Sequence, residues 1–186
     1  MNRELVTAPA STPISLTEAK AHLVVDHADD DTLITSYIEQ AVDFCEKYTG
    51  RKLITQTWCY YFDCFDAEIV INETPIQSIT SVKYQDSSDV EQTVTGTDYY
   101  TSILGNRIRI EAVNSWPSTF DKYDAVKVEI VQGYADADSV PDAIKTAIYL
   151  IVGHLYRNRE SVTAINMSEL PLGVKDFLNR YRVVYL

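Results

Sequence analysis

The stretch from Asp31 to Gly50 has the hydrophobic pattern of an amphipathic helix. Apolar residues recur there with a period of about 3.6 residues, which places them on one helix face. They are Leu33, Ile34, Tyr37, Ile38, Ala41, Phe44, Cys45 and Tyr48. Three aspartates at 29–31 precede this stripe and complement the helix dipole. Because Gly50 can supply a left-handed C-terminal stop, the pattern predicts a long helix that ends there.

A shorter helix is predicted ahead of this one. Ser15 and Glu18 have the spacing of a capping box, in which each residue satisfies a backbone N–H group of the other. The helix that follows should run through Ala19 to Leu23.

Two more helices are predicted near the C-terminus, where Pro141 and Pro171 each mark a first turn that tolerates proline. The helix after Pro141 is apolar around most of its circumference, so it should be the central buried helix, with Ile148 and Ile151 in the core. The last helix has an apolar and aromatic face, made of Val174, Phe177, Leu178, Tyr181 and Tyr185.

The hydrophobic period changes to two between the second and third predicted helices. Alternation of apolar and polar residues is typical of half-buried antiparallel strands. The clearest runs are 58–62, 68–72, 76–84, 107–111 and 126–130. Since these strands are segregated from the helices, the sequence predicts an α+β fold.

The predicted organisation is a single domain over residues 1–186. Residues 14–52 and 141–186 are expected to form a helical bundle from the N- and C-terminal helices. Residues 53–134 are expected to be an antiparallel β-rich insertion in that bundle, and residues 1–13 a flexible tail.

The charge of the chain limits its partners. The formal net charge is −11 at pH 7, which opposes tight binding to nucleic acid or to anionic membranes. The chain also contains 13 tyrosines beside 5 phenylalanines. Because tyrosine joins an apolar ring to a polar tip, this excess favours protein interfaces.

Catalytic and metal-binding motifs are not evident, so we expect neither an enzyme nor a cofactor. His22, Asp26, His27 and the aspartates at 29–31 lie close together, but capping and solvation explain them better than a metal site. The three cysteines, Cys45, Cys59 and Cys64, show no paired spacing. Free thiols in a reducing compartment are the simplest interpretation, although Cys59 and Cys64 could also pair across a strand.

Two segments are candidates for an interface. Residues 156–160 form a charged segment with a tyrosine and two arginines, a composition that is frequent at protein interfaces. A solvated helix end is an equal alternative for this segment. The last helix presents aromatic and basic residues, and it could pack on its own bundle or on a neighbour. The candidate interface residues are Tyr156, Arg157, Arg159, Phe177, Arg180, Tyr181, Arg182 and Tyr185.

The order of several short motifs resembles the head–tail connector family of tailed double-stranded DNA phages. The resemblance runs from about residue 13 to residue 183, and its motifs are structural. They are SLTEAKAHL at 15–23, DTLI at 31–34, EKYTGR at 46–51, PIQSI at 75–79, SWP at 115–117, VPDAI at 140–144 and HLYRNRE at 154–160.

This resemblance implies a structural adaptor of the virion neck, assembled in the host bacterial cytoplasm. Such proteins form a homo-oligomeric ring of about a dozen copies under the portal protein. The ring extends the DNA channel and offers a platform to the next neck or tail component. An acidic chain would let genomic DNA pass without tight binding. The alternative is a DNA-packaging or DNA-binding accessory protein, for which the arginines at 157, 159, 180 and 182 could form a local basic patch.

Overall fold

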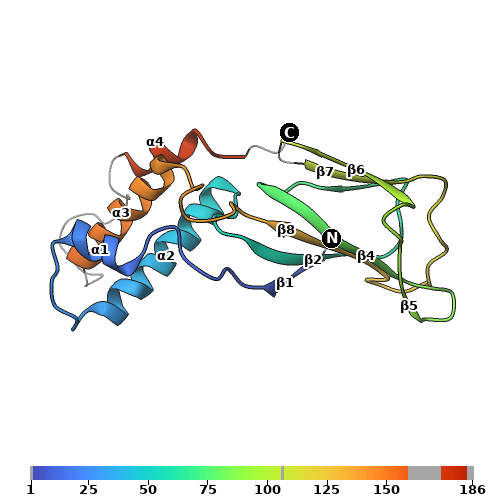
Figure 1. Cartoon of the computed structure of the whole chain (residues 1–186), viewed down its shortest axis with the longest axis horizontal. Coiled ribbons are helices and arrows are strands. Elements are labelled where there is room, and N and C mark those ends of the chain that lie inside the picture. Colours follow the sequence, from blue (N-terminus) through green and yellow to red (C-terminus); the bar gives the residue numbers. More distant parts are fainter. Residues whose placement is uncertain (1, 106, 159–172, 184–186) are drawn as a thin grey trace. The chain divides into compact units, whose positions relative to one another are not determined.

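A computed structural model of the chain describes residues 2–105, 107–158 and 173–183. These residues belong to two compact units. We call residues 2–10 and 55–133 the sheet unit, and residues 11–54, 134–158 and 173–183 the helical unit. Each unit has its own hydrophobic core, and Figure 1 shows the elements that surround each core.

The larger sheet of the sheet unit has five antiparallel strands among the described residues, in the order β1-β2-β8-β4-β5. They are β1 (Asn2–Thr7), β2 (Gln56–Phe62), β8 (Val126–Gln132), β4 (Ile76–Gln85) and β5 (Glu91–Thr93). Central β8 pairs with β2 along its whole length, and Figure 1 shows β2, β8 and β4 side by side. The edges of this sheet are therefore β1 and β5.

The smaller sheet of the same unit has three antiparallel strands, in the order β3-β7-β6. They are β3 (Glu68–Ile71), β7 (Arg107–Ala112) and β6 (Tyr99–Leu104). The turn between β6 and β7 contains Gly105, whose φ of 63° lies in the left-handed region that glycine adopts without strain.

The core of the sheet unit lies between its two sheets. One side of the core comes from the larger sheet and the other from β3 and β7. The fully buried members include Tyr60, Val82, Val128 and Ile130 from the larger sheet, with Ile71, Ile108 and Ile110 from the smaller one. These residues alternate with more exposed ones along their strands, as the period of two predicts for a sheet with one covered face.

The helical unit contains four helices among its described residues. They are α1 (Leu16–Leu23), α2 (Asp31–Thr49), α3 (Asp142–Arg157) and α4 (Val174–Asn179). The predicted capping box is present, with the Ser15 hydroxyl accepting from the Glu18 N–H and the Glu18 carboxylate accepting from the Ser15 N–H. Gly50 ends α2 with a φ of 69°, as the sequence predicts. No helix of the described residues is both long and apolar enough to cross a bilayer.

The core of the helical unit receives side chains from all four helices. Contacts are most numerous between α2 and α3, which Figure 1 shows close together. Ile148 is fully buried and Ile151 nearly so, which confirms that these residues of α3 belong to the core. Burying one such aliphatic side chain stabilises the folded state by about 1.5–3 kcal/mol relative to leaving that side chain exposed.

The predicted fold class is wrong. We expected a helical bundle of N- and C-terminal helices as the framework, with the strands as an insertion. The structure is instead mixed and rich in strands, with two antiparallel sheets and four short helices in its described part. Helical periodicity revealed where helices form, but α1 has 8 residues and α4 has 6, too few for the long parallel packing of a bundle.

The N-terminal residues also differ from the expected flexible tail, because residues 2–7 form β1. This strand pairs with β2, and Arg3 lies opposite Tyr60. The Arg3 guanidinium forms an ion pair with Glu73 and lies 5.2 Å from the centre of the Trp58 ring. The segment was missed because Leu5 and Val6 are adjacent, so the run does not alternate.

Candidate assembly surfaces

The short C-terminal helix α4 is packed into its own unit. Val174 and Leu178 are fully buried and belong to the core of the helical unit. They stand four residues apart, the spacing that places two side chains on one face of a helix. One face of α4 is therefore already covered by the chain itself.

Residues after α4 are tied to the C-terminal end of α2 by hydrogen bonds. The Arg51 Nε donates to the Tyr181 carbonyl oxygen at 2.6 Å, and the Val183 N–H donates to the Thr49 carbonyl oxygen at 2.8 Å. The Tyr48 hydroxyl donates to the Asn179 Oδ1 at 2.7 Å. The bond from Val183 satisfies the carbonyl of the last residue of α2, where intrahelical partners run out.

The other side of the same segment is exposed and basic. Phe177 is 42% exposed, and Lys175, Arg180 and Arg182 are exposed as well. The Arg182 guanidinium lies 5.6 Å from the centre of the Tyr48 ring, a distance at which cation–π attraction operates. Aromatic and arginine side chains together are a frequent composition of protein interfaces.

The remaining predicted interface residues lie elsewhere. The Tyr156 hydroxyl donates to the Asp30 Oδ2 at 2.5 Å, beside the start of α2, and Arg157 is exposed. Asp30 is the N-cap of α2 and Thr49 is its last residue, about 28 Å apart at 1.5 Å per residue. The structure therefore separates Tyr156 from Tyr181, whereas Arg159 and Tyr185 lie outside the described residues.

An exposed apolar strand is a feature that sequence reasoning missed. Tyr100 is 64% exposed, Ile103 is 44% exposed and Leu104 is 79% exposed, and all three belong to β6. The signal was present in the sequence, since residues 99–103 are aromatic, β-branched or small polar, residue 104 is leucine, and none of the six carries a charge.

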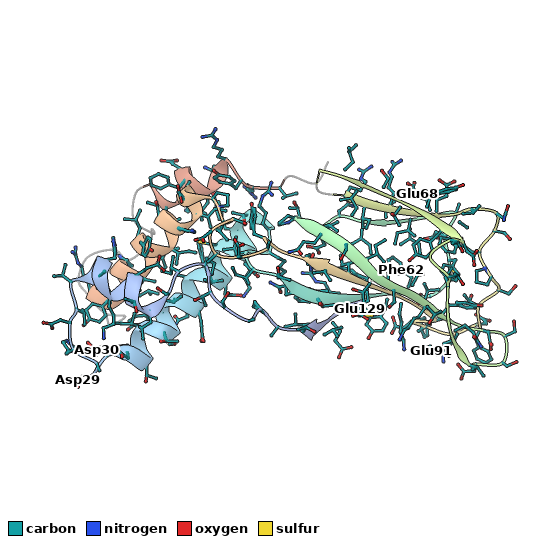
Figure 2. All side chains as sticks on the ribbon, in the orientation of Figure 1. Asp29, Asp30, Phe62, Glu68, Glu91 and Glu129 are labelled. Atoms are coloured by element: carbon teal, nitrogen blue, oxygen red, sulfur yellow. The ribbon has the colours of Figure 1, made fainter. Side chains whose placement is uncertain are left out.

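Acidic side chains lie on both units (Figure 2). Asp29 and Asp30 are at the turn before α2, where Asp29 is exposed. On the larger sheet the Glu91 carboxylate accepts a hydrogen bond from the Lys127 Nζ at 2.7 Å, which lowers the pKa of Glu91. Some of the acidic charge on the sheet is thus offset locally.

Sites for metals or cofactors do not stand out in the part of the chain that the structure describes. It contains no group of three or more His, Cys, Asp or Glu residues that could hold a metal ion. The three cysteines are unpaired, with Cys45 and Cys59 buried and Cys64 exposed. Burial raises the pKa of the Cys45 thiol to about 12, so this cysteine is a weak nucleophile.

Solved structures similar to this chain come from the neck of a gene transfer agent particle. The neck of an empty gene transfer agent (GTA) particle, computed with C6 symmetry, contains a chain 22% identical, with a TM-score of 0.81. The native GTA neck, computed with C12 symmetry, gives 22% identity and a TM-score of 0.79. Each comparison covers 100% of this chain and 97% of the other, and shows a shared fold. No curated protein matches the sequence.

The family comparison is specific and covers most of the chain. The model for the phage gp6-like head-tail connector protein matches residues 13–182, which include both units almost completely. A match over this length extends through all four helices and seven of the eight described strands. The chain belongs to the phage gp6-like head–tail connector family, and its role is that of a structural connector.

Proposed function

We propose that this connector forms a homo-oligomeric ring of about a dozen copies in the virion neck. Family membership is the observation that carries the proposal. The similar chains in necks reconstructed with C6 and C12 symmetry support it, because such symmetry requires several copies around one axis. The ring joins the portal protein on the head side to the next neck or tail component on the other.

The ring also extends the DNA channel. A chain of net charge −11 repels the phosphate backbone, so genomic DNA slides past without tight binding. The exposed cysteine Cys64 is unpaired, which suits assembly in the reducing cytoplasm of a host bacterium. The acidic net charge supports a passive conduit better than a DNA-binding accessory protein.

The exposed side of the C-terminal segment is the surface we propose for docking on the portal. Phe177 supplies an apolar anchor, and Arg180 and Arg182 supply charges that favour an acidic partner surface. The buried side of the same helix holds the segment in place, so the docking residues are presented on a fixed support.

A reconstruction of the particle neck tests the ring directly. The expected result is density for several copies of this chain around the axis, between the portal and the tail. Finding a single copy, or none in the neck, contradicts the proposal.

Charge reversal tests the docking surface. The double variant Arg180→Glu/Arg182→Glu should fold with little loss of stability, because both residues are exposed and, among the described contacts, only the cation–π contact of Arg182 with Tyr48 is removed, and should no longer join portal-bearing heads. Lys47→Glu on α2 is the control, since Lys47 is also an exposed cation and forms an ion pair only with Asp43 in the described chain. Normal joining by the double variant would show that docking uses another surface.

A gel-shift assay with double-stranded DNA at low and moderate salt tests the passive channel. The wild-type protein should leave the DNA unshifted at moderate salt. A salt-resistant shift would favour the DNA-packaging accessory function instead.

A further inference from the structure

The sandwich of the sheet unit is unequal, with five strands in one sheet and three in the other among the described residues. Within the described part of the chain β6 pairs only with β7, so the outer edge of β6 presents backbone N–H and C=O groups that no other described strand pairs with. A strand edge of this kind is a template for pairing with another chain.

The inner face of this sheet also continues beyond its covered part. Ile103 on β6 lies opposite Ile108 on β7, and directly opposed residues in an antiparallel pair point to the same face. Ile108 is fully buried, yet Ile103 is 44% exposed. The apolar face that forms the core therefore extends onto β6, where the described chain does not cover it.

Protective features are missing from β6. Natural edge strands are usually blocked by lysine, proline, a bulge or short length. The six residues of β6 contain no charge and no proline, and its pairing with β7 runs without a bulge. On a chain with 43 charged residues, an uncharged edge strand of this length indicates a surface that is covered in the assembled state.

A second edge of the same length is present on the same unit. β1 also has six residues, all of them exposed, and its outer edge is unpaired among the described residues. Its pairing with β2 is regular from Asn2 to Leu5 and shifts register between Leu5 and Thr7. It exposes the large apolar residues Leu5 and Val6. The other two edges are poorer partners, because β5 has three residues and β3 has four, and the terminal Glu68 of β3 pairs with Arg109.

We propose that the β6 edge of one copy pairs with the β1 edge of the next copy. Successive subunits of a ring make head-to-tail contacts, which need two different and complementary surfaces on each subunit. The two six-residue edges provide such a pair, and their union covers Ile103 and Leu104 with the Leu5 and Val6 of the neighbour. This inference rests on the proposed ring, for which it supplies the lateral contact.

Crosslinking in assembled necks tests this pairing. The background variant is Cys64→Ser, which removes the exposed cysteine and leaves Cys45 and Cys59 buried. One population then carries Leu104→Cys and a second, tagged for size, carries Val6→Cys. After both are assembled together on portal-bearing heads, a short bismaleimide should give dimers that contain one copy of each. Dimers formed by Leu104→Cys alone, or no dimers from rings that have assembled, would overturn the pairing.

A charge placed on the edge gives an independent measurement. Leu104→Lys should fold normally, because the side chain is 79% exposed, but should lower the connector copies retained per head by about tenfold. Val24→Lys is the matched control at an apolar residue of the helical unit that is 91% exposed, and it should assemble like the wild type. Wild-type retention by Leu104→Lys, or the same loss in both variants, would contradict the proposal.

The wild-type protein separates this failure from a failure of the proposed function. If the wild type occupies the neck as a ring while Leu104→Lys assembles normally, only the β6–β1 contact is wrong. If the wild type forms no ring in the neck, the proposed function itself is wrong.

Discussion

The helical unit and the sheet unit differ in whether they cover the apolar side chains of one short element, α4 in the helical unit and β6 in the sheet unit. The helical unit buries one side of α4 in its own core and fixes the following residues to the end of α2. The sheet unit leaves three large apolar residues of β6 exposed at the edge of its smaller sheet. Both elements have six residues and contain aromatic side chains, so composition alone does not distinguish a covered element from an open one. The tertiary contacts make the distinction.

Leucine-to-alanine substitutions in α4 and β6 should show the largest difference between the two units in the free energy of unfolding. Leu178→Ala in α4 should lower the free energy of unfolding by about 2–5 kcal/mol, because it leaves a cavity in a packed core. Leu104→Ala in β6 should change it by no more than about 0.5 kcal/mol, because the side chain is exposed in the isolated chain. Chemical denaturation of both variants measures the difference, and equal values would show that β6 is covered within the subunit.

Removing the arginine that holds the C-terminal segment should have the next largest effect. Arg51→Met deletes the hydrogen bond to the Tyr181 carbonyl oxygen and should cost about 1.5–3 kcal/mol, the usual range for a charged donor. Thermal unfolding checks the value, and Arg107→Met on the exposed face of β7 is a suitable control. An unchanged melting temperature for Arg51→Met would mean that the Arg51 hydrogen bond does not contribute to holding the segment.

The hydrogen bond from Tyr48 to Asn179 tests the same attachment of the C-terminal segment, with a smaller expected effect. Tyr48→Phe keeps the ring and loses the hydroxyl that donates to Asn179, so it should cost about 0.5–1.5 kcal/mol. The stacking of residue 48 on Phe44 should survive, since only the hydroxyl is lost. Urea denaturation of Tyr48→Phe against the wild type gives the difference directly, and a stabilising effect would be contrary to this account.

The smallest expected effect is a pH dependence that both units share. Hydrogen bonds from Ser15 lower the pKa of Glu18 in the helical unit, and the hydrogen bond from Lys127 lowers the pKa of Glu91 in the sheet unit. A carboxyl whose pKa is lower in the folded state stabilises the fold above its unfolded pKa, and this contribution is lost as the pH falls through the folded value. Stability should therefore decline on acidification from pH 5 downward.

Single variants assign the acid sensitivity to the two units. Glu18→Gln and Glu91→Gln should each flatten the decline, because glutamine does not titrate, and melting curves recorded across the acidic range measure this. Both carboxyls are largely exposed, so each effect is small. A steeper decline in either variant would reverse the sign that the hydrogen bonds imply.

The sequence by itself determined the local features of this protein. The capping box of Ser15 and Glu18 and the stop at Gly50 depend on residues within a few positions of each other. The helical period of the apolar residues likewise predicted α2 and α3, and the alternating period predicted the central strands. The burial of Ile148 and Ile151 followed from the apolar residues around most of the circumference of α3. The order of short motifs was sufficient to identify the connector family.

Only the tertiary structure decided which elements pair and which edges stay open. β1 pairs with residues 50 to 59 positions further along the chain and is held by the ion pair of Arg3 and Glu73. Nothing in the six residues of β1 indicates that partner. The wrong fold class has the same cause, because periodicity reports one element at a time. Whether Leu178 is covered and Leu104 is exposed depends on contacts between distant segments, and those contacts exist only after the chain has folded.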